Sequence, residues 1–454
     1  MLTAASGQDP AGLAPDRLFA GIDFTTSPAV VVAVSGGGDS IALLHLLSRH
    51  LVRTRIVAVT VDHALRPDSA REAEDVGAFC ATLGVSHLIR AWHGDKPATG
   101  LSAAARDARY RLLAEAADDV GATLLLTGHT EDDQAETVAM RAERGEGRGL
   151  AGMAPDTLLD GRLWLVRPLL ATRRAALRDY LRAEGIGWVD DPTNEDAAYE
   201  RVRARRRLAD PAAFARAIET AREGARERER LGEAAAALIA TCALPAPGLV
   251  RLAANVFRAA PRDAATYALR LLLATAGGGG HLPDDPRTAA LLDRFGEPAF
   301  RASLARATVE RRGDAIFLYR EARGLPEPGP ALNGQIWDGR FRLGNVEGET
   351  IGPAGRFGGG RADEASGVPP ALARAAAAAR PALFRSAECL GPLDGRSDAD
   401  SSPLPTQPFA VPLAAPFARI LPAFDLAPAR ALMKLVGGEL PPPPPYAGHT
   451  APEA

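Results

Sequence analysis

The clearest chemical signal in the sequence is a short run of glycine, serine and aspartate at residues 35–40. It comprises Ser35, Gly36, Gly37, Gly38, Asp39 and Ser40. Glycines let backbone N–H groups approach a phosphate closely, and the two serine hydroxyls add further donors. A carboxylate repels phosphate unless a divalent cation lies between them. The run therefore predicts a polyphosphate site in which Asp39 is a Mg²⁺ ligand.

Two well-known glycine loops do not match this run. A Walker A loop requires lysine after its glycines, and residues 35–40 contain none. A dinucleotide fingerprint requires a sixth-position glycine, where Ile41 stands. An ordinary glycine turn entering a core helix is the structural alternative, but the serines and Asp39 directly after an apolar run favour a phosphate site.

A second polar cluster follows another apolar run that we interpret as a buried strand. His129, Asp133 and Glu136 are separated by four and then three positions, which places them on one face of a predicted helix. Asp133 could hold Mg²⁺ together with Asp39, and His129 could orient or protonate a phosphate or reacting group. Alternatively, Asp132 and Asp133 are simply helix N-terminal carboxylates favoured by the helix dipole.

Both clusters need a scaffold that brings them together. Strand, loop and helix alternate along the first part of the chain, with predicted strands at residues 30–34, 55–61, 86–92 and 124–126. This alternation predicts an α/β fold with a doubly wound, mainly parallel sheet. Because ligands bind such sheets at the carboxyl ends of strands, the two clusters would share one edge. His63 would lie beside them, although a loop residue bonded to its own backbone is an equally good interpretation.

Arginines form two further candidate groups. Arg106 and Arg109 are one turn apart in a predicted helix, where they could stabilise charge on a pyrophosphate leaving group, although such arginines are ordinarily solvated. Residues 201–207 contain five arginines, which form either a solvated helix face or a contact with RNA phosphates. The net charge of −3 gives nucleic-acid binding no support by itself.

Composition limits the protein class. A chain of 454 residues suits two or three domains. No apolar run reaches membrane-spanning length, and residues 1–17 lack the features of a signal peptide, so we expect a cytoplasmic protein without membrane partners. The three cysteines are far apart, which excludes a Cys-x-x-Cys metal site and suits a reducing compartment.

The order of these motifs resembles one family closely, the tRNA(Ile)-lysidine synthetases of the N-type ATP pyrophosphatase (PP-loop) superfamily. The resemblance is carried by the runs Ser35–Ser40, Asp62–Arg66, Ala105–Tyr110, Gly128–Thr137, Arg167–Leu169, Asp191–Asn194 and Arg201–Arg203. The phosphate loop is shared by several ligases, whereas the complete series is much more specific. It covers about residues 25–210. One departure is Val202, which replaces the asparagine usual between the two arginines and affects a polar contact rather than the adenylation chemistry.

The resemblance implies an ATP- and Mg²⁺-dependent ligase that acts on a tRNA(Ile) with a CAU anticodon. ATP would adenylate the C2 oxygen of the first anticodon cytidine, and the side-chain amine of free L-lysine would then displace AMP to give lysidine. In this family the loop residues Ser35 to Ser40 would bind ATP, and Asp39 and Asp133 would hold the metal. The groups that would flank the base and the lysine are Arg109, His129 and Glu136. The groups that would contact tRNA or transition-state charge are Arg201, Arg203 and Arg205.

Other activities of the superfamily are alternatives to this interpretation. Thiolation of a tRNA base would use the same loop but needs a sulfur carrier or a cysteine pair, against which the scattered cysteines argue. Amidotransferase-linked synthetases act on small molecules and give no reason for the arginine cluster. An RNA-binding protein with an inactive nucleotide fold is the non-enzymatic alternative, and the intact Asp39, His129 and Asp133 disfavour it. A homodimer is left open.

The sequence beyond residue 210 is less informative. We expect an N-terminal extension at 1–24 and a PP-loop catalytic domain at 25–210. Residues 211–330 would form a mainly helical tRNA-contacting domain with a hairpin near its end, and 331–440 a small α+β C-terminal domain. We further expect a glycine-rich mobile loop at 144–153 and a disordered, proline-rich tail at 441–454.

Overall fold

The computed structural model describes residues 13–51, 54–64, 69–94, 96–97, 99–145, 147–189, 200–358, 368–385, 388–395 and 407–446. The chain forms two compact units. The first contains Met1–Arg228 and Pro442–Ala454, and the second contains Glu229–Pro441. The boundary between the units lies inside helix α8 (Pro211–Ala240), whereas we expected a domain boundary at residue 210. The second unit contains most of residues 211–330 together with residues 331–440, which we expected to form two separate domains.

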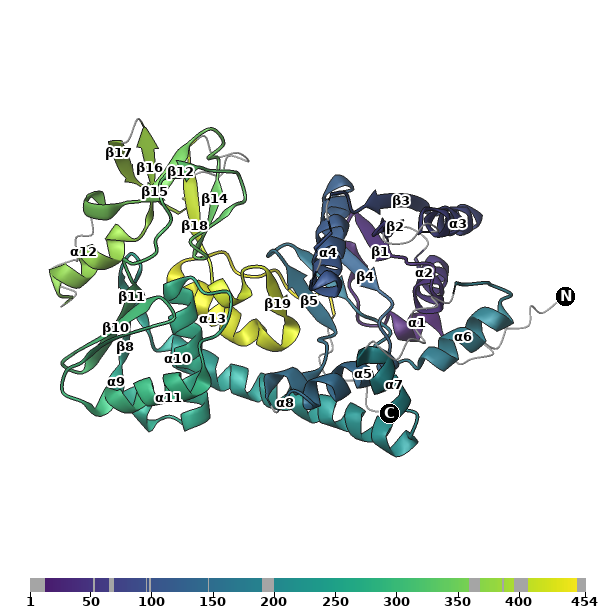
Figure 1. The fold of residues 1–454 in the computed structure, drawn as a ribbon, viewed down its shortest axis with the longest axis horizontal. Helices are drawn as coiled ribbons and strands as arrows, with labels where there is room; N and C mark the ends of the chain where they lie inside the picture. Colours follow the sequence, from purple (N-terminus) through teal and green to yellow (C-terminus); the bar gives the residue numbers. More distant parts are fainter. Residues whose placement is uncertain are drawn as a thin grey trace. The chain divides into compact units, whose positions relative to one another are not determined.

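The first unit is built on a mainly parallel sheet (Figure 1). Its strands are β1 (Ala29–Ala33), β2 (Arg55–Asp62), β3 (Ser86–Ala91), β4 (Leu124–Thr127), β5 (Asp156–Leu159) and β6 (Leu163–Val166), and they run in the order β5-β6-β4-β1-β2-β3. Within this order β5 pairs antiparallel with β6, and the remaining pairs are parallel. The doubly wound, mainly parallel α/β fold predicted from the sequence is confirmed.

Apolar burial explains why this sheet forms. Val30, Val31 and Val32 have no exposed surface, as expected for a parallel strand covered on both faces. Helix α4 packs its Leu113 and Ala117 into the same core cluster as residues of β1, β2, β4 and β6. The helices of this unit are α1 (Pro15–Leu18), α2 (Gly38–His50), α3 (Ser69–Thr82), α4 (Leu101–Asp119), α5 (Glu131–Ala142), α6 (Arg174–Ala183) and α7 (Glu200–Arg207), with short 3₁₀ turns η1 (Phe24–Thr26) and η2 (Arg148–Ala151).

The strand order creates a topological switch point between β1 and β4. The chain leaves β1 toward β2 and β3 on one side, and it later places β4 and β6 on the other side. The register pairs Ala33 with Thr127, so both strands end at the same level and are followed by the polar loops. Ligand sites of open α/β sheets lie at such a point.

The second unit combines helices with antiparallel sheets. A five-stranded sheet in the order β7-β8-β11-β10-β9 consists of β7 (Ala243–Ala246), β8 (Leu249–Ala253), β9 (Arg301–Leu304), β10 (Ala307–Arg312) and β11 (Ala315–Arg320). The β10–β11 hairpin turns at Gly313, as predicted. Its helices are α9 (Ala254–Ala259), α10 (Arg262–Gly277), α11 (Asp285–Asp293), α12 (Pro370–Ala378) and α13 (Leu426–Val436), with the C-terminal half of α8 and the 3₁₀ turns η4 (Arg294–Gly296), η5 (Gly355–Phe357), η7 (Ala415–Phe417) and η8 (Ala423–Asp425).

Two smaller sheets complete this unit. One has the order β12-β15-β16-β17, from β12 (Gly329–Pro330), β15 (Thr350–Pro353), β16 (Pro381–Arg385) and β17 (Glu388–Pro392). The other has the order β13-β14-β18, from β13 (Ile336–Trp337), β14 (Phe341–Gly344) and β18 (Phe409–Pro412), and a short strand β19 (Ile420–Pro422) follows. The region that we expected to be mainly helical therefore also carries a complete antiparallel sheet.

Two segments that we expected to be mobile or disordered form hydrogen bonds with neighbouring parts of the first unit. The glycine-rich loop is held in place, because Arg141 donates hydrogen bonds of 2.8 Å to the carbonyls of Gly149 and Gly152, and Gln134 bonds both backbone groups of Met153. Near the C-terminus, the Pro445 carbonyl accepts a bond from Asp23 N–H, and residue 446 forms a β-bridge with residue 22. Residues 447–454 lie outside the described part. No helix in the described ranges combines the length and apolar character needed to cross a membrane.

Candidate functional site

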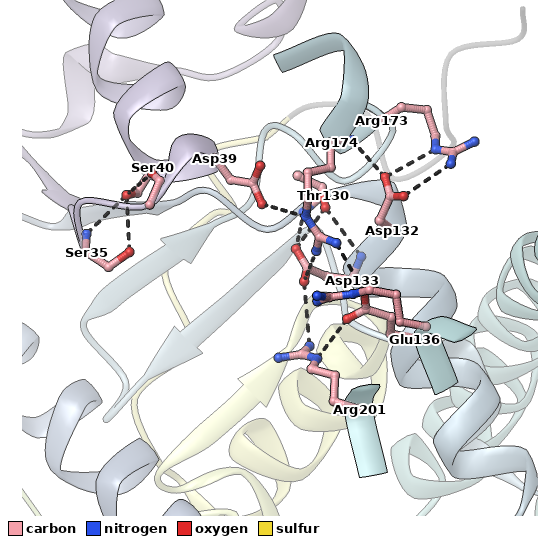
Figure 2. A network of polar contacts seen from close by, with 12 residues as sticks. Ser35, Asp39, Ser40, Thr130, Asp132, Asp133, Glu136, Arg173, Arg174 and Arg201 are labelled. Atoms are coloured by element: carbon pink, nitrogen blue, oxygen red, sulfur yellow. Dashed lines mark hydrogen bonds and ion pairs between the residues drawn. The ribbon is translucent and has the colours of Figure 1, made fainter. Parts of the chain in front are cut away.

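The predicted phosphate loop lies between β1 and α2. Gly36 has φ +85°, a backbone conformation that residues with a side chain rarely adopt. Ser40 Oγ accepts a hydrogen bond from Ser35 N–H at 3.1 Å and donates one to the Gly37 carbonyl at 2.9 Å (Figure 2). These bonds fix the loop shape, and α2 begins with its unbonded N–H groups directed out of the helix end, where they can meet an anion.

The loop is braced by two neighbouring segments. A Cβ atom added at Gly128 would lie 2.8 Å from the Asp39 carbonyl oxygen, so only glycine allows the end of β4 to pass this close to the start of α2. On another side, Val189 N–H donates a 3.0 Å hydrogen bond to the Gly36 carbonyl, and a Cβ atom added at Gly38 would lie 3.4 Å from the Trp188 ring. The phosphate loop therefore lies directly against the loop that precedes α5, and a hydrogen bond joins it to the segment after α6.

Asp133 is a helix N-terminal carboxylate, and one of its oxygens also faces the site. Its Oδ2 accepts from Thr130 N–H at 2.8 Å and from the Thr130 hydroxyl at 2.9 Å, in the capping box that begins α5. Its Oδ1 is left for the site, where it accepts from Arg174 at 2.8 Å. The neighbouring Asp132 is structural instead, since it bonds the Arg173 guanidinium and the Arg174 backbone N–H.

The centre of the site is the guanidinium of Arg174 (Figure 2). Its Nε donates to Asp39 Oδ2 at 3.0 Å, one terminal nitrogen to Asp133 Oδ1 at 2.8 Å, and the other to Glu136 Oε1 at 3.2 Å. One cation thus joins carboxylates from α2 and α5, and it occupies the position between the two predicted metal ligands.

Burial and charge act against each other at these carboxylates. Burial raises the pKa of Asp39 to about 6, and the Arg174 guanidinium limits that rise. Burial also favours the neutral form of Asp133, but the charges of Arg174 and Arg201 and the Thr130 N–H hold the pKa of Asp133 below its usual value. Asp133 is therefore ionised at neutral pH.

Glu136 is almost completely buried and is surrounded by arginines. Besides Arg174, it forms ion pairs with Arg201 Nε at 3.0 Å and Arg205 Nε at 2.9 Å. Arg201 and Arg205 are one turn apart on α7, and the buried Val202 between them fixes which face of the helix they occupy. The apolar Val202 thus fits this register. Arg203 is exposed on the same helix.

His129 lies directly after β4 and is neutral. Its Nδ1 is 2.8 Å from the Thr127 hydroxyl. Burial and the nearby positive charge of Arg167 together lower the pKa of His129 to about 3. An imidazole in this state does not protonate a phosphate at neutral pH, so of the two predicted roles orientation by hydrogen bonding is the one that the structure favours.

Arg109 and His63 lie at the border of the site. Arg109 is exposed on α4, and its charge acts on Arg201 and His63. The His63 ring packs edge-on against Trp92, with 6.0 Å between ring centroids, and it is Asp62 that forms the local turn by accepting from the backbone at residue 64. The predicted Asp191-Pro-Thr-Asn segment lies outside the described residues.

Sequence reasoning did not identify Arg174 as a residue of the site. Arg173 and Arg174 stand at the start of α6, where the helix dipole disfavours positive charge. Two cations at this end require anionic partners, and that requirement was the available signal. Arg173 forms an ion pair with Asp132, and Arg174 forms ion pairs with the three carboxylates of the site.

The donor set at the centre is compatible with Mg²⁺. The side chains of Asp39 and Asp133 offer hard oxygen atoms, and the guanidinium between them shows that a positive charge fits there. Among the described residues, no three metal-binding side chains surround one point. The protein would therefore supply only part of the coordination shell, as is usual for Mg²⁺ beside substrate phosphates.

Comparisons with known proteins agree with this geometry. A PP-loop domain model matches residues 16–212. The chain is 49% identical to a tRNA(Ile)-lysidine synthase from Mesorhizobium japonicum, a match that covers 96% of this chain and 98% of the relative. It is 42% identical to the enzymes of that name from Rhizobium meliloti and Brucella melitensis, over 70% and 76% of this chain and 74% and 81% of those relatives.

Proposed function

Because the chain belongs to the tRNA(Ile)-lysidine synthase family, we propose that it joins free L-lysine to C2 of the first anticodon cytidine of a tRNA(Ile) with a CAU anticodon. It is an ATP-dependent ligase of tRNA modification. The observation that carries the detailed proposal is the convergence of Asp39, Asp133 and Glu136 beside the phosphate loop, at the switch point of the sheet.

In the first step, the C2 oxygen of cytidine attacks the α-phosphorus of ATP, and pyrophosphate leaves. The N–H groups of the glycine loop and of the start of α2 bind the phosphates. Asp39 and Asp133 would hold Mg²⁺, which would neutralise phosphate charge. The step is useful because a carbonyl oxygen is a poor leaving group, whereas AMP is a good one.

In the second step, the side-chain amine of lysine attacks C2, and AMP departs with the former C2 oxygen. Glu136 flanks the amine, which is an ammonium ion at neutral pH and must release a proton before it attacks. His129 orients a reacting group as a neutral hydrogen-bonding partner. Arg109 flanks the base, and Arg201, Arg203 and Arg205 contribute positive charge for the tRNA or for the transition state.

The direct test measures AMP release and lysine incorporation with ATP, labelled lysine and a tRNA(Ile) transcript. We expect incorporation into the transcript with a CAU anticodon, and none when its first anticodon base is changed. Asp39→Ala should reduce incorporation at least about a hundredfold, the scale of losing one electrostatic contact in a transition state. ATP cleavage without lysine incorporation would contradict the proposed substrate.

Thiolation of a tRNA base gains no support from Cys80 or Cys242. Cys80 is buried, and burial raises the pKa of its thiol to about 11. Burial likewise raises the pKa of Cys242 to about 12. Thiols in this state are poor nucleophiles at neutral pH. Sulfur incorporation into the transcript in the same assay would favour thiolation over lysine ligation.

A further inference from the structure

The three bonds of Arg174 are not equivalent. In the described part of the chain, Asp39 forms an ion pair with Arg174 alone, and the more distant charge of Arg178 adds to it. Without Arg174, Asp133 would still accept its two hydrogen bonds from Thr130. Glu136 would still have two ion pairs with arginines of α7. If the Arg174 side chain turned away, Asp39 would be the carboxylate left without an ion pair.

The Arg174 backbone is fixed, but its side chain is not enclosed. The backbone N–H donates to Asp132 Oδ2 at 2.8 Å, and Glu131 N–H donates to the Thr172 carbonyl at 3.0 Å. These bonds tie the first turn of α6 to the first turn of α5. The Arg174 side chain retains 18% exposure, so it can rotate toward solvent while its backbone stays in place.

A divalent cation and this guanidinium cannot both lie between Asp39 and Asp133. Each carboxylate oxygen that faces the centre already accepts from Arg174, at 3.0 and 2.8 Å. Two positive charges at such a separation repel strongly in a half-buried site. Binding of a metal between the carboxylates therefore requires that the Arg174 side chain leaves.

We propose that Arg174 is an exchangeable cation that holds Asp39 and Asp133 in the nucleotide-free protein. When ATP brings its divalent cation, the guanidinium yields the carboxylates to the metal and turns to phosphate charge. Arg174 is thus a positioning residue that keeps the empty site assembled and prevents the carboxylates from capturing free metal. The proposal rests on the proposed function, since it takes Asp39 and Asp133 as metal ligands.

The test measures Mn²⁺ binding to the whole protein without nucleotide, by equilibrium dialysis. In the wild-type protein Arg174 competes with the metal, so binding should be weak. Arg174→Gln should bind Mn²⁺ at least tenfold more tightly, and adding Asp39→Asn to it should abolish the gain. Arg173→Gln is the matched control, because the neighbouring Arg173 pairs with Asp132 and stacks on Phe214, and its Mn²⁺ affinity should equal that of the wild type.

Unchanged Mn²⁺ affinity in Arg174→Gln would overturn the proposal. Circular dichroism establishes whether each variant is folded. If Arg174→Gln is not, Arg174→Lys keeps the charge but lacks the fork that reaches three carboxylates, and it should bind Mn²⁺ more tightly than the wild type. The assay uses neither tRNA nor lysine. If the wild type forms lysidine but the variants bind Mn²⁺ no more tightly than it does, only the proposed exchange is refuted. If the wild type forms no lysidine, the proposed function is refuted.

Discussion

Two arginine–carboxylate networks, one in each unit, use the same chemical groups but have opposite charges at their centres. In the first unit one arginine, Arg174, lies among three carboxylates. In the second unit one carboxylate, Asp338, lies among Arg306, Arg320 and Arg340. The Arg174 side chain is 18% exposed, whereas the side chains of Asp338 and Arg320 have no exposure at all.

The second network is locked by its hydrogen bonds. Arg320 binds Asp338 with two nitrogens, at 3.0 and 3.1 Å, and also donates to the carbonyls of Arg323 and Gly324. Arg340 donates to Asp338 at 2.8 Å and to the Ala379 carbonyl. Burial lowers the pKa of Arg340 to about 10, so this arginine stays charged at neutral pH. Backbone carbonyls thus accept the hydrogen bonds from those guanidinium N–H groups that the single carboxylate cannot accept.

The difference separates a structural network from an exchangeable one. Buried charges with every partner fixed cannot change partners without a large penalty. Carboxylates that share one partly exposed arginine can accept another cation in its place. The exposure of the central side chain, and the number of partners that remain when one is removed, therefore predict how each network responds to substitution.

The largest expected effect is that of Asp338→Asn. Asn tolerates the backbone of this position, φ +50°, so the change removes mainly the charge. Breaking a buried ion network by removing one partner costs about 3–5 kcal/mol in the free energy of unfolding. Urea denaturation followed by circular dichroism measures this loss. Asp285→Asn, which removes a 61% exposed partner of Arg270, is the control and should cost less than about 1 kcal/mol.

Asp156 extends the comparison to a buried carboxylate with no ion pair among the described residues. Burial raises its pKa to about 7, against the opposing effects of the Tyr446 backbone N–H and Arg167. The folded chain therefore binds this proton more tightly than the unfolded chain. The resulting stabilisation is complete below about pH 4 and is lost as the pH rises through 7, by at most about 4 kcal/mol.

Asp156→Asn should flatten this pH dependence. Urea denaturation of the variant and the wild type at pH 5 and pH 8 measures the difference between the two slopes. The Asp285→Asn protein again serves as the control, because its exposed carboxylate should leave the slope of the wild type unchanged. An equal loss of stability between pH 5 and pH 8 in Asp156→Asn and in the wild type would mean that other groups cause it.

The sequence predicted the scaffold of the site better than the contacts within it. Runs such as Val30–Val34 and the glycines after them have local causes, so strands, phosphate loop and the α5 cluster were all predictable. Arg174 was not, because it contacts a residue 135 positions away in the chain. Strand β5 was also missed, although the Asp160-Gly161 turn between two apolar runs is a hairpin signal. The glycine content of the loop at 144–153 likewise does not reveal the hydrogen bonds that Arg141 donates to it.

Glu136→Gln tests whether the arginines of the first network can replace a lost ion pair with contacts to water. The change leaves Arg174, Arg201 and Arg205 without their shared charge, but Arg201 and Arg205 are 47% and 38% exposed and can turn to water. We therefore expect a loss of about 1–3 kcal/mol in the free energy of unfolding, clearly smaller than that of Asp338→Asn. Urea denaturation of the two variants side by side makes the comparison. Equal losses would show that both networks are locked.

The smallest expected effect is that of Arg306→Gln, at the border of the second network. Arg306 is 43% exposed, and Asp338 retains the two buried arginines without it. Its removal also relieves repulsion among three guanidinium groups, which offsets the lost ion pair. The free energy of unfolding from urea denaturation should therefore change by less than about 1 kcal/mol. A loss as large as that of Asp338→Asn would mean that exposure does not distinguish the two networks, and the number of partners would have to explain their difference.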